Sequence, residues 1–345
     1  REGQLLVDEV IEQAKISQAK KQNIQRLLIS DLNLTAVKKS INSMRANRDF
    51  IPLSVSALAR SRADWLFGMN LTRAYTLAGQ KAGFGNVLSV GRVQTPILGL
   101  IVNRDLNIES FVSKPFYEVE AFLQTEKREV FVGKWKPSEA CQPYMDAENR
   151  VLSKPLAQNV VDRITQKTGK IINIDKNNQQ QPPPLPFSLS SLQISAAKAF
   201  GMSAKQVLDT CQQLYERHKL ITYPRSDCQY LPKEHLKEAA IVTSAIAAIA
   251  PDLASTLNTI DLKKKSRAWD DKKVSAHHAI IPTSRSQKSG SLSATEIKVY
   301  GLIAKQYLAQ FFPNHRYAET SVTSEIEGGT FLTKQKQVLD LGWKS

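Results

Sequence analysis

The sequence lacks a long apolar run, a cysteine framework and a phosphate-binding loop. No stretch approaches the roughly 20 apolar residues that a membrane-spanning helix needs, and no signal peptide opens the chain. Only three cysteines occur, and none forms a C-x-x-C pair or has the spacing of a zinc ribbon. The G-x-x-x-x-G-K-[ST] sequence of the P-loop ATPases is also missing. These absences predict a cytoplasmic protein without disulfides or structural zinc.

The composition favours a polyanionic partner. The 345 residues are 42% hydrophobic, which is enough for more than one core. A formal net charge of +15 makes nucleic acid the leading partner, with an anionic membrane surface as the alternative.

Helical and strand patterns alternate along the chain. Helical spacing of apolar residues dominates up to about residue 112, with a strand at 24–29, and a β-rich region follows. The tract 177–186, rich in Gln and Pro, resembles a hinge or linker. A second helical region and a final β-rich region come after it. We therefore predict five parts: 1–22, 23–112, 113–178, 179–312 and 313–345.

Two short helices precede a tyrosine. Ser188 or Ser190 is suited to cap the first, Gly201 breaks it, and Ser203 is suited to cap the second. A strand at 220–222 would complete a winged-helix-like unit. Such units often bind duplex DNA, and they also occur as packing motifs without any contact to DNA.

The stretch 222–225, TYPR, places Tyr223 beside a cation in a stiff bend. Pro224 fixes its own φ and biases Tyr223 towards an extended conformation. A phenol with a pKa near ~10 attacks a phosphate well only if a cation stabilises the developing charge. Arg225 stands where it could do so, which favours phosphoryl transfer. A packed tyrosine beside a surface arginine is the alternative.

Four stretches together resemble the motifs of the type IA DNA topoisomerases. They are residues 222–227 (TYPRSD, the active-site signature), 275–283 (SAHHAIIPT, the histidine motif), 88–96 (LSVGRVQTP, the strand-binding segment) and 1–4 (REGQ, the end of the acidic Toprim motif). The motifs occur in the family's order and span essentially the whole chain. Within the family, the sequence is most similar to bacterial topoisomerase III.

The resemblance implies a mixed α and β, multidomain toroid with a helical base, a β-rich arch and a winged-helix-like tyrosine domain. Tyr223 would cut a single-stranded DNA segment and form a 5′-phosphotyrosine link. A second strand would pass through the gap, and the free 3′-hydroxyl would reverse the bond without ATP. The resemblance further implies a monomer associated with the nucleoid.

The resemblance also implies roles for single residues. Arg225 would stabilise the scissile phosphate, and His277 would support proton transfer or hold a phosphate, with a purely structural histidine as the alternative. The residues that would contact the DNA strand are Arg60, Asp64, Ser89, Val90, Gly91, Arg92, Val93 and Gln94. Helix capping and ordinary surface charge are the alternatives for this set.

Glu2 resembles the last acidic residue of the D-x-D-x-E motif, so it would be catalytic and would bind Mg²⁺. The other acidic residues of that motif would lie before Arg1, and a further part of the base would follow Ser345. We therefore interpret the chain as a piece of a longer protein. We expect that this piece alone neither relaxes nor religates DNA efficiently.

The polar segment 136–150 resembles the decatenation loop of topoisomerase III, and an ordinary surface loop is the alternative.

A non-catalytic DNA-binding module is the rival function, built on the winged-helix-like unit. A tyrosine recombinase or a relaxase would need an Arg-His-Arg constellation or a His cluster, and neither is evident. DNA binding alone does not require the TYPR turn. Its presence therefore favours the enzyme over the binding module.

Overall fold

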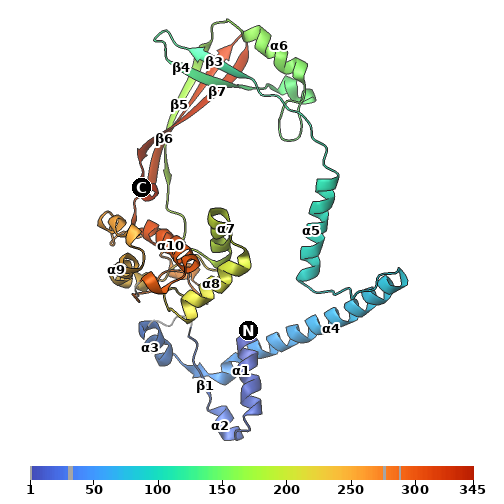
Figure 1. Ribbon diagram of the computed structural model, residues 1–345, viewed down its shortest axis with the longest axis vertical. Coiled ribbons are helices and arrows are strands. Elements are labelled where there is room, and N and C mark those ends of the chain that lie inside the picture. Colours follow the sequence, from blue (N-terminus) through green and yellow to red (C-terminus); the bar gives the residue numbers. More distant parts are fainter. Residues whose placement is uncertain (1, 30–33, 275–276, 287–288) are drawn as a thin grey trace. The chain divides into compact units, whose positions relative to one another are not determined.

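The structure is a computed structural model that describes residues 2–29, 34–274, 277–286 and 289–345 (Figure 1). It divides into two compact units, Arg1–Ser113 and Lys114–Ser345. Within the described ranges, none of the helices is both long and apolar enough to cross a membrane.

The first unit is mainly helical. Its elements are α1 (Glu2–Gln13), α2 (Gln18–Gln22), β1 (Gln25–Arg26), α3 (Leu34–Asn42), β2 (Arg45–Ala46), the 3-10 turn η1 (Asn47–Phe50), α4 (Ile51–Lys81) and α5 (Gln94–Glu109). Pro52 lies in the first turn of α4. A backbone N–H at this position has no acceptor within the helix, so the missing N–H of proline costs no hydrogen bond. The strand predicted at 24–29 is shorter than expected, because only two of its residues pair with β2.

A buried glutamine joins α1 to the small sheet. The Gln4 side chain donates to Asp8 and to Asn47, both at 3.0 Å, and accepts from the Arg26 Nε at 2.9 Å. Burial acts to raise the pKa of Asp8, but hydrogen bonds from Asn47 and Gln4 outweigh it and lower the pKa. This polar contact fixes the start of the chain against the turn that leads into α4.

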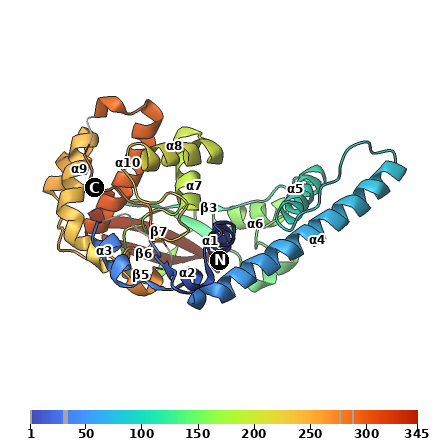
Figure 2. The same ribbon diagram turned by 90° about the horizontal axis from the view of Figure 1, so that it is seen from below.

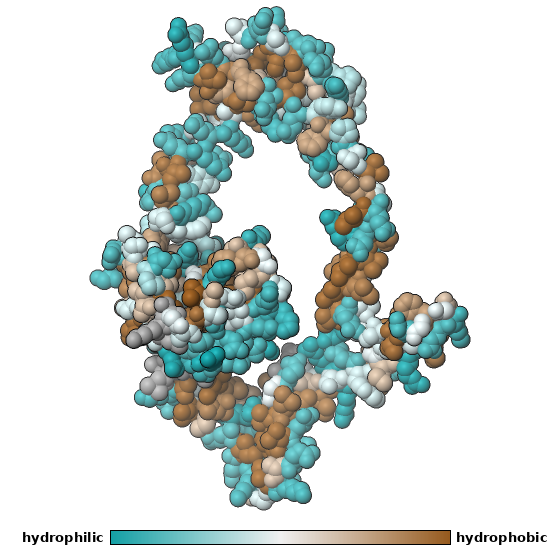
Figure 3. Space-filling model, in the orientation of Figure 1, coloured by the Kyte–Doolittle hydropathy of each residue, from teal (hydrophilic) through white to brown (hydrophobic). Residues whose placement is uncertain are grey.

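The first half of the helix α5, residues 96–102, is apolar all round, and none of the residues of α5 is buried. Leu100 is 70% exposed and Ile101 is 53% exposed, and hydrophobic residues follow one another along this helix in Figure 3. Helices that are apolar all round are normally buried. The part of the chain that the structure describes leaves α5 uncovered.

A five-stranded antiparallel sheet forms one part of the second unit. Its order is β3 (Glu120–Gln124), β4 (Val130–Lys136), β7 (Gly329–Asp340), β6 (His315–Ile326) and β5 (Lys170–Gln181). The helix α6 (Lys154–Ile164) packs on one face through Val160, above Ala121 and Phe331. Segments near both ends of the unit therefore share a sheet and a core (Figure 1).

The prediction of a linker at 177–186 was wrong for its first half. Residues 177–181 are the end of β5 and pair in register with β6 as far as His315. The backbone hydrogen bonds of β6 hold this exposed polar segment extended, although its composition favours disorder. Pro182 has no N–H to donate, and the strand ends before it.

Helices form the other part of the second unit. They are α7 (Leu189–Phe200), α8 (Ala204–Glu216), α9 (Ala239–Ile249) and α10 (Ala294–Leu308), and Figures 1 and 2 show α7 and α8 beside α10. The 3-10 turns are η2 (Glu139–Tyr144), η3 (Lys233–Glu238), η4 (Pro251–Leu253), η5 (Ser255–Asn258), η6 (Asp271–Lys273), η7 (Ser289–Ser291), η8 (Ala309–Phe311) and η9 (Gly342–Lys344).

The helix pair begins and ends as its sequence predicts. Ser188 and Ser203 each accept from the third residue of their helix in a capping box, and Gly201 ends α7 with φ +68°. The strand predicted at 220–222 was wrong. The described residues form only a single bridge there, between Ile221 and Pro282, because the segment bends at once into the tyrosine turn.

The end of β7 offers a test of close backbone packing. Gly342 has φ +52°, and a Cβ there would lie 2.5 Å from the Pro313 carbonyl oxygen. Gly342→Ala should lower the free energy of unfolding by more than the roughly 1–2 kcal/mol that a left-handed alanine costs. Gly328→Ala is the matched control, since φ is +72° and nothing lies within 4 Å. Urea denaturation measures the unfolding free energy of both variants. Equal losses for Gly342→Ala and Gly328→Ala would contradict a role of the close approach to the Pro313 carbonyl oxygen.

Candidate active site

Two aromatic groups contact the Tyr223 ring. Its centroid lies 4.5 Å from that of the His277 imidazole, with 32° between the planes. The ring of Tyr215, on α8, meets it edge-on at 5.8 Å and 82°. The Tyr223 side chain is half-buried. These contacts hold the phenol in a defined orientation while leaving it accessible.

The hydroxyl of Thr222 brings the tyrosine and the histidine together. It donates to the Ala279 carbonyl at 3.1 Å and accepts from the Ile281 N–H at 3.0 Å. The Thr222 N–H also donates to the Ile281 carbonyl at 2.9 Å. Because Tyr223 and His277 are close neighbours of the bonded residues, these hydrogen bonds set the distance between their rings.

The two adjacent histidines have different surroundings, as an extended backbone requires. His278 is buried, with Nδ1 2.8 Å from the Ala279 carbonyl and its ring 4.6 Å from that of His235. The Nδ1 of His277 is also buried, and no hydrogen-bond partner for it exists among the described residues. A buried nitrogen without a partner is costly and is a recurrent feature of catalytic sites.

The Arg225 side chain is exposed beyond the buried Pro224. Within the described ranges it makes no ion pair and no hydrogen bond through its guanidinium. Its five N–H donors are therefore available to an anion.

The predicted strand-binding residues lie in the first unit, where three of them form one chain of ion pairs with Glu2. Arg60 contacts Glu2 at 2.8 Å and Asp64 at 3.9 Å, and Arg92 binds Asp64 in a bidentate pair at 2.7 and 3.1 Å. The hydrogen bond to Asp64 raises the pKa of Arg92. All four side chains are exposed, so the chain of pairs contributes little to stability.

Threonines tie the segment after α4 to the two helices that flank it, Thr72 on α4 and Thr95 on α5. The Val90 N–H donates to the Thr72 hydroxyl at 2.9 Å, and the Gly91 N–H donates to that of Thr95 at 3.0 Å. Ser89 accepts from Gln94 at 2.8 Å, and Val93 is 62% exposed. Sequence reasoning missed Thr72 and Thr95, although small hydroxyl side chains facing a loop are a common anchoring signal.

The residues described here do not by themselves form a magnesium site. The Glu2 carboxylate is paired with Arg60, and no three His, Cys, Asp or Glu side chains of the described ranges come together. Mg²⁺ prefers octahedral coordination by oxygen, which one carboxylate cannot supply.

Comparison with known proteins decides the family. A family model described as DNA topoisomerase matches residues 49–345. This chain belongs to the DNA topoisomerase family. The match confirms the resemblance stated from the four motifs.

Named relatives agree with this assignment. The whole chain is 54% identical to DNA topoisomerase 3 of Vibrio cholerae and 53% identical to that of Salmonella typhimurium, and it covers 54% and 53% of their lengths. Identity to DNA topoisomerase 3 of Bacillus subtilis is 34% over 45% of that protein. The topoisomerase chain thus spans about half the length of the curated relatives it matches. The names of these relatives agree with the resemblance to topoisomerase III.

A solved structure confirms the fold class. Full-length topoisomerase I from Thermotoga maritima matches 99% of this chain and 53% of its own, with a TM-score of 0.68 and 20% identity. The mixed α and β fold of a type I topoisomerase is therefore as predicted.

A buried contact between His218 and Glu296 supports the segment of the topoisomerase chain that leads to Tyr223. The His218 Nε2 lies 3.1 Å from Glu296, whose other oxygen accepts from the Ser293 N–H at 2.7 Å in the capping box of α10. Burial acts to raise the pKa of Glu296, but the hydrogen bonds from Ser293 and the contact with His218 lower it overall.

The lowered pKa of Glu296 predicts a pH-dependent stability. A depressed folded-state pKa stabilises the protein above the unfolded value of 4.5, and this contribution disappears as the pH falls through the folded-state pKa. The loss in unfolding free energy on Glu296→Gln should therefore shrink between about pH 6 and pH 3. Urea denaturation at each pH measures this loss in unfolding free energy, and the exposed Glu126→Gln is the control. A loss that stayed constant over this range would count against the assignment.

The hydroxyl of Thr222 yields a second prediction. Thr222→Val keeps the shape but leaves the Ile281 N–H without its acceptor and removes the hydrogen bond from Thr222 to the Ala279 carbonyl, which should cost about 2 kcal/mol of unfolding free energy. Thr222→Ser keeps the hydroxyl and should lose much less. Comparable losses in urea denaturation would show that the methyl group, and not the hydrogen bonds, matters.

Proposed function

We propose that this chain carries the cleavage centre of a type IA topoisomerase of the topoisomerase III group, acting on single-stranded segments of DNA. The contact between Tyr223 and His277 is the observation that supports this proposal most strongly, together with Arg225, which follows Tyr223 by two residues and makes no ion pair within the described ranges. A nucleophile, a ring nitrogen and a cation are the groups that phosphoryl transfer needs.

The reaction would be a reversible transesterification. The Tyr223 oxygen attacks the phosphorus of a phosphodiester, the bond from phosphorus to the 3′ oxygen breaks, and a 5′-phosphotyrosine link forms. The phenol loses its proton and the departing 3′ oxygen gains one, and the His277 ring is the group in contact with the phenol ring. Attack by the 3′-hydroxyl reverses both bonds. The number of ester bonds stays constant, so no ATP is consumed.

Charge would hold the strand in place. Arg225 would bind the scissile phosphate, and Arg60, Asp64, Arg92 and the segment 89–94 would contact the strand. Contacts to phosphates position DNA without reading its sequence, so we expect little preference for particular bases. Glu2 would supply one oxygen ligand of Mg²⁺ in the whole protein, but the described residues do not complete such a site.

The loop 136–150 would act as a decatenation loop, which takes part in unlinking DNA rings. It contains η2 and a turn closed by the ion pair between Asp146 and Arg150 at 2.6 Å. A loop of fixed conformation suits a specific contact better than an unstructured one. This role rests on the resemblance to topoisomerase III.

Covalent trapping tests the proposed function. The full-length protein is incubated with a 5′-³²P-labelled or 3′-labelled single-stranded oligonucleotide, denatured and run on a gel. We expect a protein adduct on the 3′-labelled fragment, and Tyr223→Phe should abolish it. Tyr215→Phe is the matched control, because it keeps the ring beside Tyr223 and should keep the adduct.

Two results would contradict the proposal. An adduct that persists in Tyr223→Phe moves the nucleophile elsewhere. Tight binding of the oligonucleotide without any adduct favours the non-catalytic DNA-binding module.

A further inference from the structure

A lysine stands at a backbone position that favours glycine. Lys219 follows the helix α8 and has φ +59°, in the left-handed region that disfavours a side chain. Thr283 holds this turn, because its hydroxyl donates to the Lys219 carbonyl at 2.7 Å and its N–H donates to the Leu220 carbonyl at 2.9 Å. Backbone strain that the surrounding structure enforces is concentrated at functional sites. The side chain of Lys219 is therefore a candidate for a function.

An aromatic ring holds the ammonium group of Lys219. Its Nζ atom lies 5.7 Å from the centroid of the Tyr215 ring, and a cation is attracted to the face of such a ring. The same ring meets that of Tyr223 edge-on, with 5.8 Å between the two centroids. One side chain thus connects the ammonium group to the ring of the proposed nucleophile.

The surroundings of this ammonium group favour an anion. The segment 217–225 contains two arginines and Lys219, all exposed, and no acidic residue. Lys219 makes no ion pair with any residue that the structure describes. The exposed Arg285 belongs to the same turn, because its N–H donates to the Thr283 hydroxyl at 3.3 Å. Positive charge without carboxylate partners attracts phosphate.

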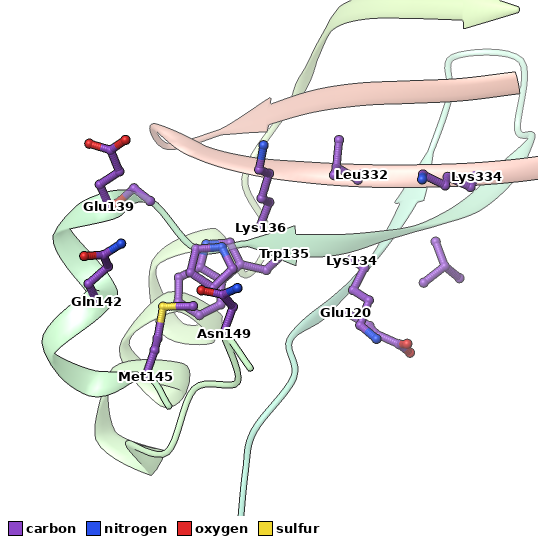
Figure 4. Close-up of a pocket in the computed structure, with 13 residues that line it drawn as sticks. Glu120, Lys134, Trp135, Lys136, Glu139, Gln142, Met145, Asn149, Leu332 and Lys334 are labelled. Carbon is purple, nitrogen blue, oxygen red and sulfur yellow. The ribbon is translucent and has the colours of Figure 1, made fainter. Parts of the chain in front are cut away.

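Another group of lysines lacks such a ring contact. Lys134, Lys136 and Lys334 line a pocket of about 720 Å³ where the sheet meets the loop 136–150 (Figure 4). Trp135 also borders this pocket, but successive side chains of β4 alternate between the faces of the sheet, so its ring faces away from the lysines. Lys134 is moreover paired with Glu118 at 2.6 Å. Lys219 is the better placed cation for a contact that must be precise.

We propose that Lys219 binds a phosphate of the DNA strand that Tyr223 cuts, next in the strand to the phosphate that reacts. Arg225 binds the scissile phosphate, and Lys219 binds its neighbour. A strand held at two successive phosphates presents the reacting phosphorus to the Tyr223 oxygen in a defined orientation, and phosphoryl transfer depends mainly on such positioning. This inference rests on the proposed function, since it adds a phosphate-binding residue to the same centre.

The ring contacts favour the neighbouring phosphate over the scissile one. A phosphate under attack must touch the Tyr223 oxygen, whereas the ammonium group of Lys219 contacts the ring of Tyr215. Over the described ranges, no cation–ring contact joins Lys219 to Tyr223. Arg225, two residues after Tyr223, remains the partner of the scissile phosphate, and Lys219 meets the next phosphate of the same strand.

The salt dependence of binding tests the contact without cleavage. The full-length Tyr223→Phe protein is titrated with a fluorescent single-stranded oligonucleotide at several salt concentrations. Adding Lys219→Gln should reduce the slope of log K against log salt by about 0.7, which is the contribution of one contact to a single strand. Lys219→Arg keeps the charge and should keep the slope. Lys127→Gln, which changes an exposed lysine between β3 and β4, should also keep it. An unchanged slope in Lys219→Gln would overturn the proposal.

A glycine variant separates binding from folding. Lys219→Gly removes the same charge at a backbone position that suits glycine, so the urea midpoint should not fall. Its slope should nevertheless fall as far as that of Lys219→Gln. A slope that fell in Lys219→Gln and stayed unchanged in Lys219→Gly would assign the effect to the fold of the turn and would overturn the proposal.

Neutral phosphate analogues locate the contact. One phosphate at a time, on either side of the cleaved bond, is replaced by a methylphosphonate, and covalent trapping is measured with the unsubstituted full-length protein and with Lys219→Gln. At one position beside the scissile phosphate, the replacement should weaken trapping by the unsubstituted protein and have no further effect on Lys219→Gln, because that contact is already lost.

The outcomes distinguish this proposal from the proposed function. Independent losses from Lys219→Gln and from the methylphosphonate at every position would overturn the role of Lys219. Absence of any trapping by the unsubstituted protein would contradict the proposed function instead. The salt slope in the Tyr223→Phe protein needs no cleavage, so it would still show whether Lys219 binds a phosphate.

Discussion

The proposed cleavage centre depends on one hydroxyl group. Thr222 and Ala279 are 57 residues apart in the chain, and the Thr222 side chain joins them by bonding one carbonyl and one N–H of the histidine segment. Backbone pairing near it, between Thr283 and Leu220, holds the same two segments together. The contact of Tyr223 with His277 is therefore a consequence of hydrogen bonding at their neighbours, which fixes the rings without using the reactive atoms.

The candidate reactive groups lie where a dense core meets the surface. Ile221 and Ile280 are almost fully buried, whereas Tyr223 and His277 are half-buried and Arg225 is exposed. A packed core restrains the backbone because interiors have little free volume. Its edge leaves the phenol and the guanidinium open to a strand.

Sequence reasoning singled out the candidate reactive residues but not the contacts that position them. The TYPR turn and the histidine motif singled out Tyr223 and His277, and the structure puts their rings in contact. The role of Thr222 was missed, because a hydroxyl reveals its partners only when distant segments meet. The strand at 177–181 was missed for the same reason, since β6 supplies its hydrogen bonds. The pocket at Trp135 combines strands with a loop, and no local pattern predicts it.

The two sets of cations differ in what binding a phosphate would require of them. In the first unit, Arg60 and Arg92 are already paired with Glu2 and Asp64, so a phosphate there must replace or share a carboxylate partner. Arg225 has no such partner among the described residues, and it needs to give up only water. A paired guanidinium therefore suits a strand that must bind and leave, because the carboxylate returns as the phosphate departs. An unpaired guanidinium suits the phosphate at which charge develops during the reaction, where every added interaction lowers the barrier.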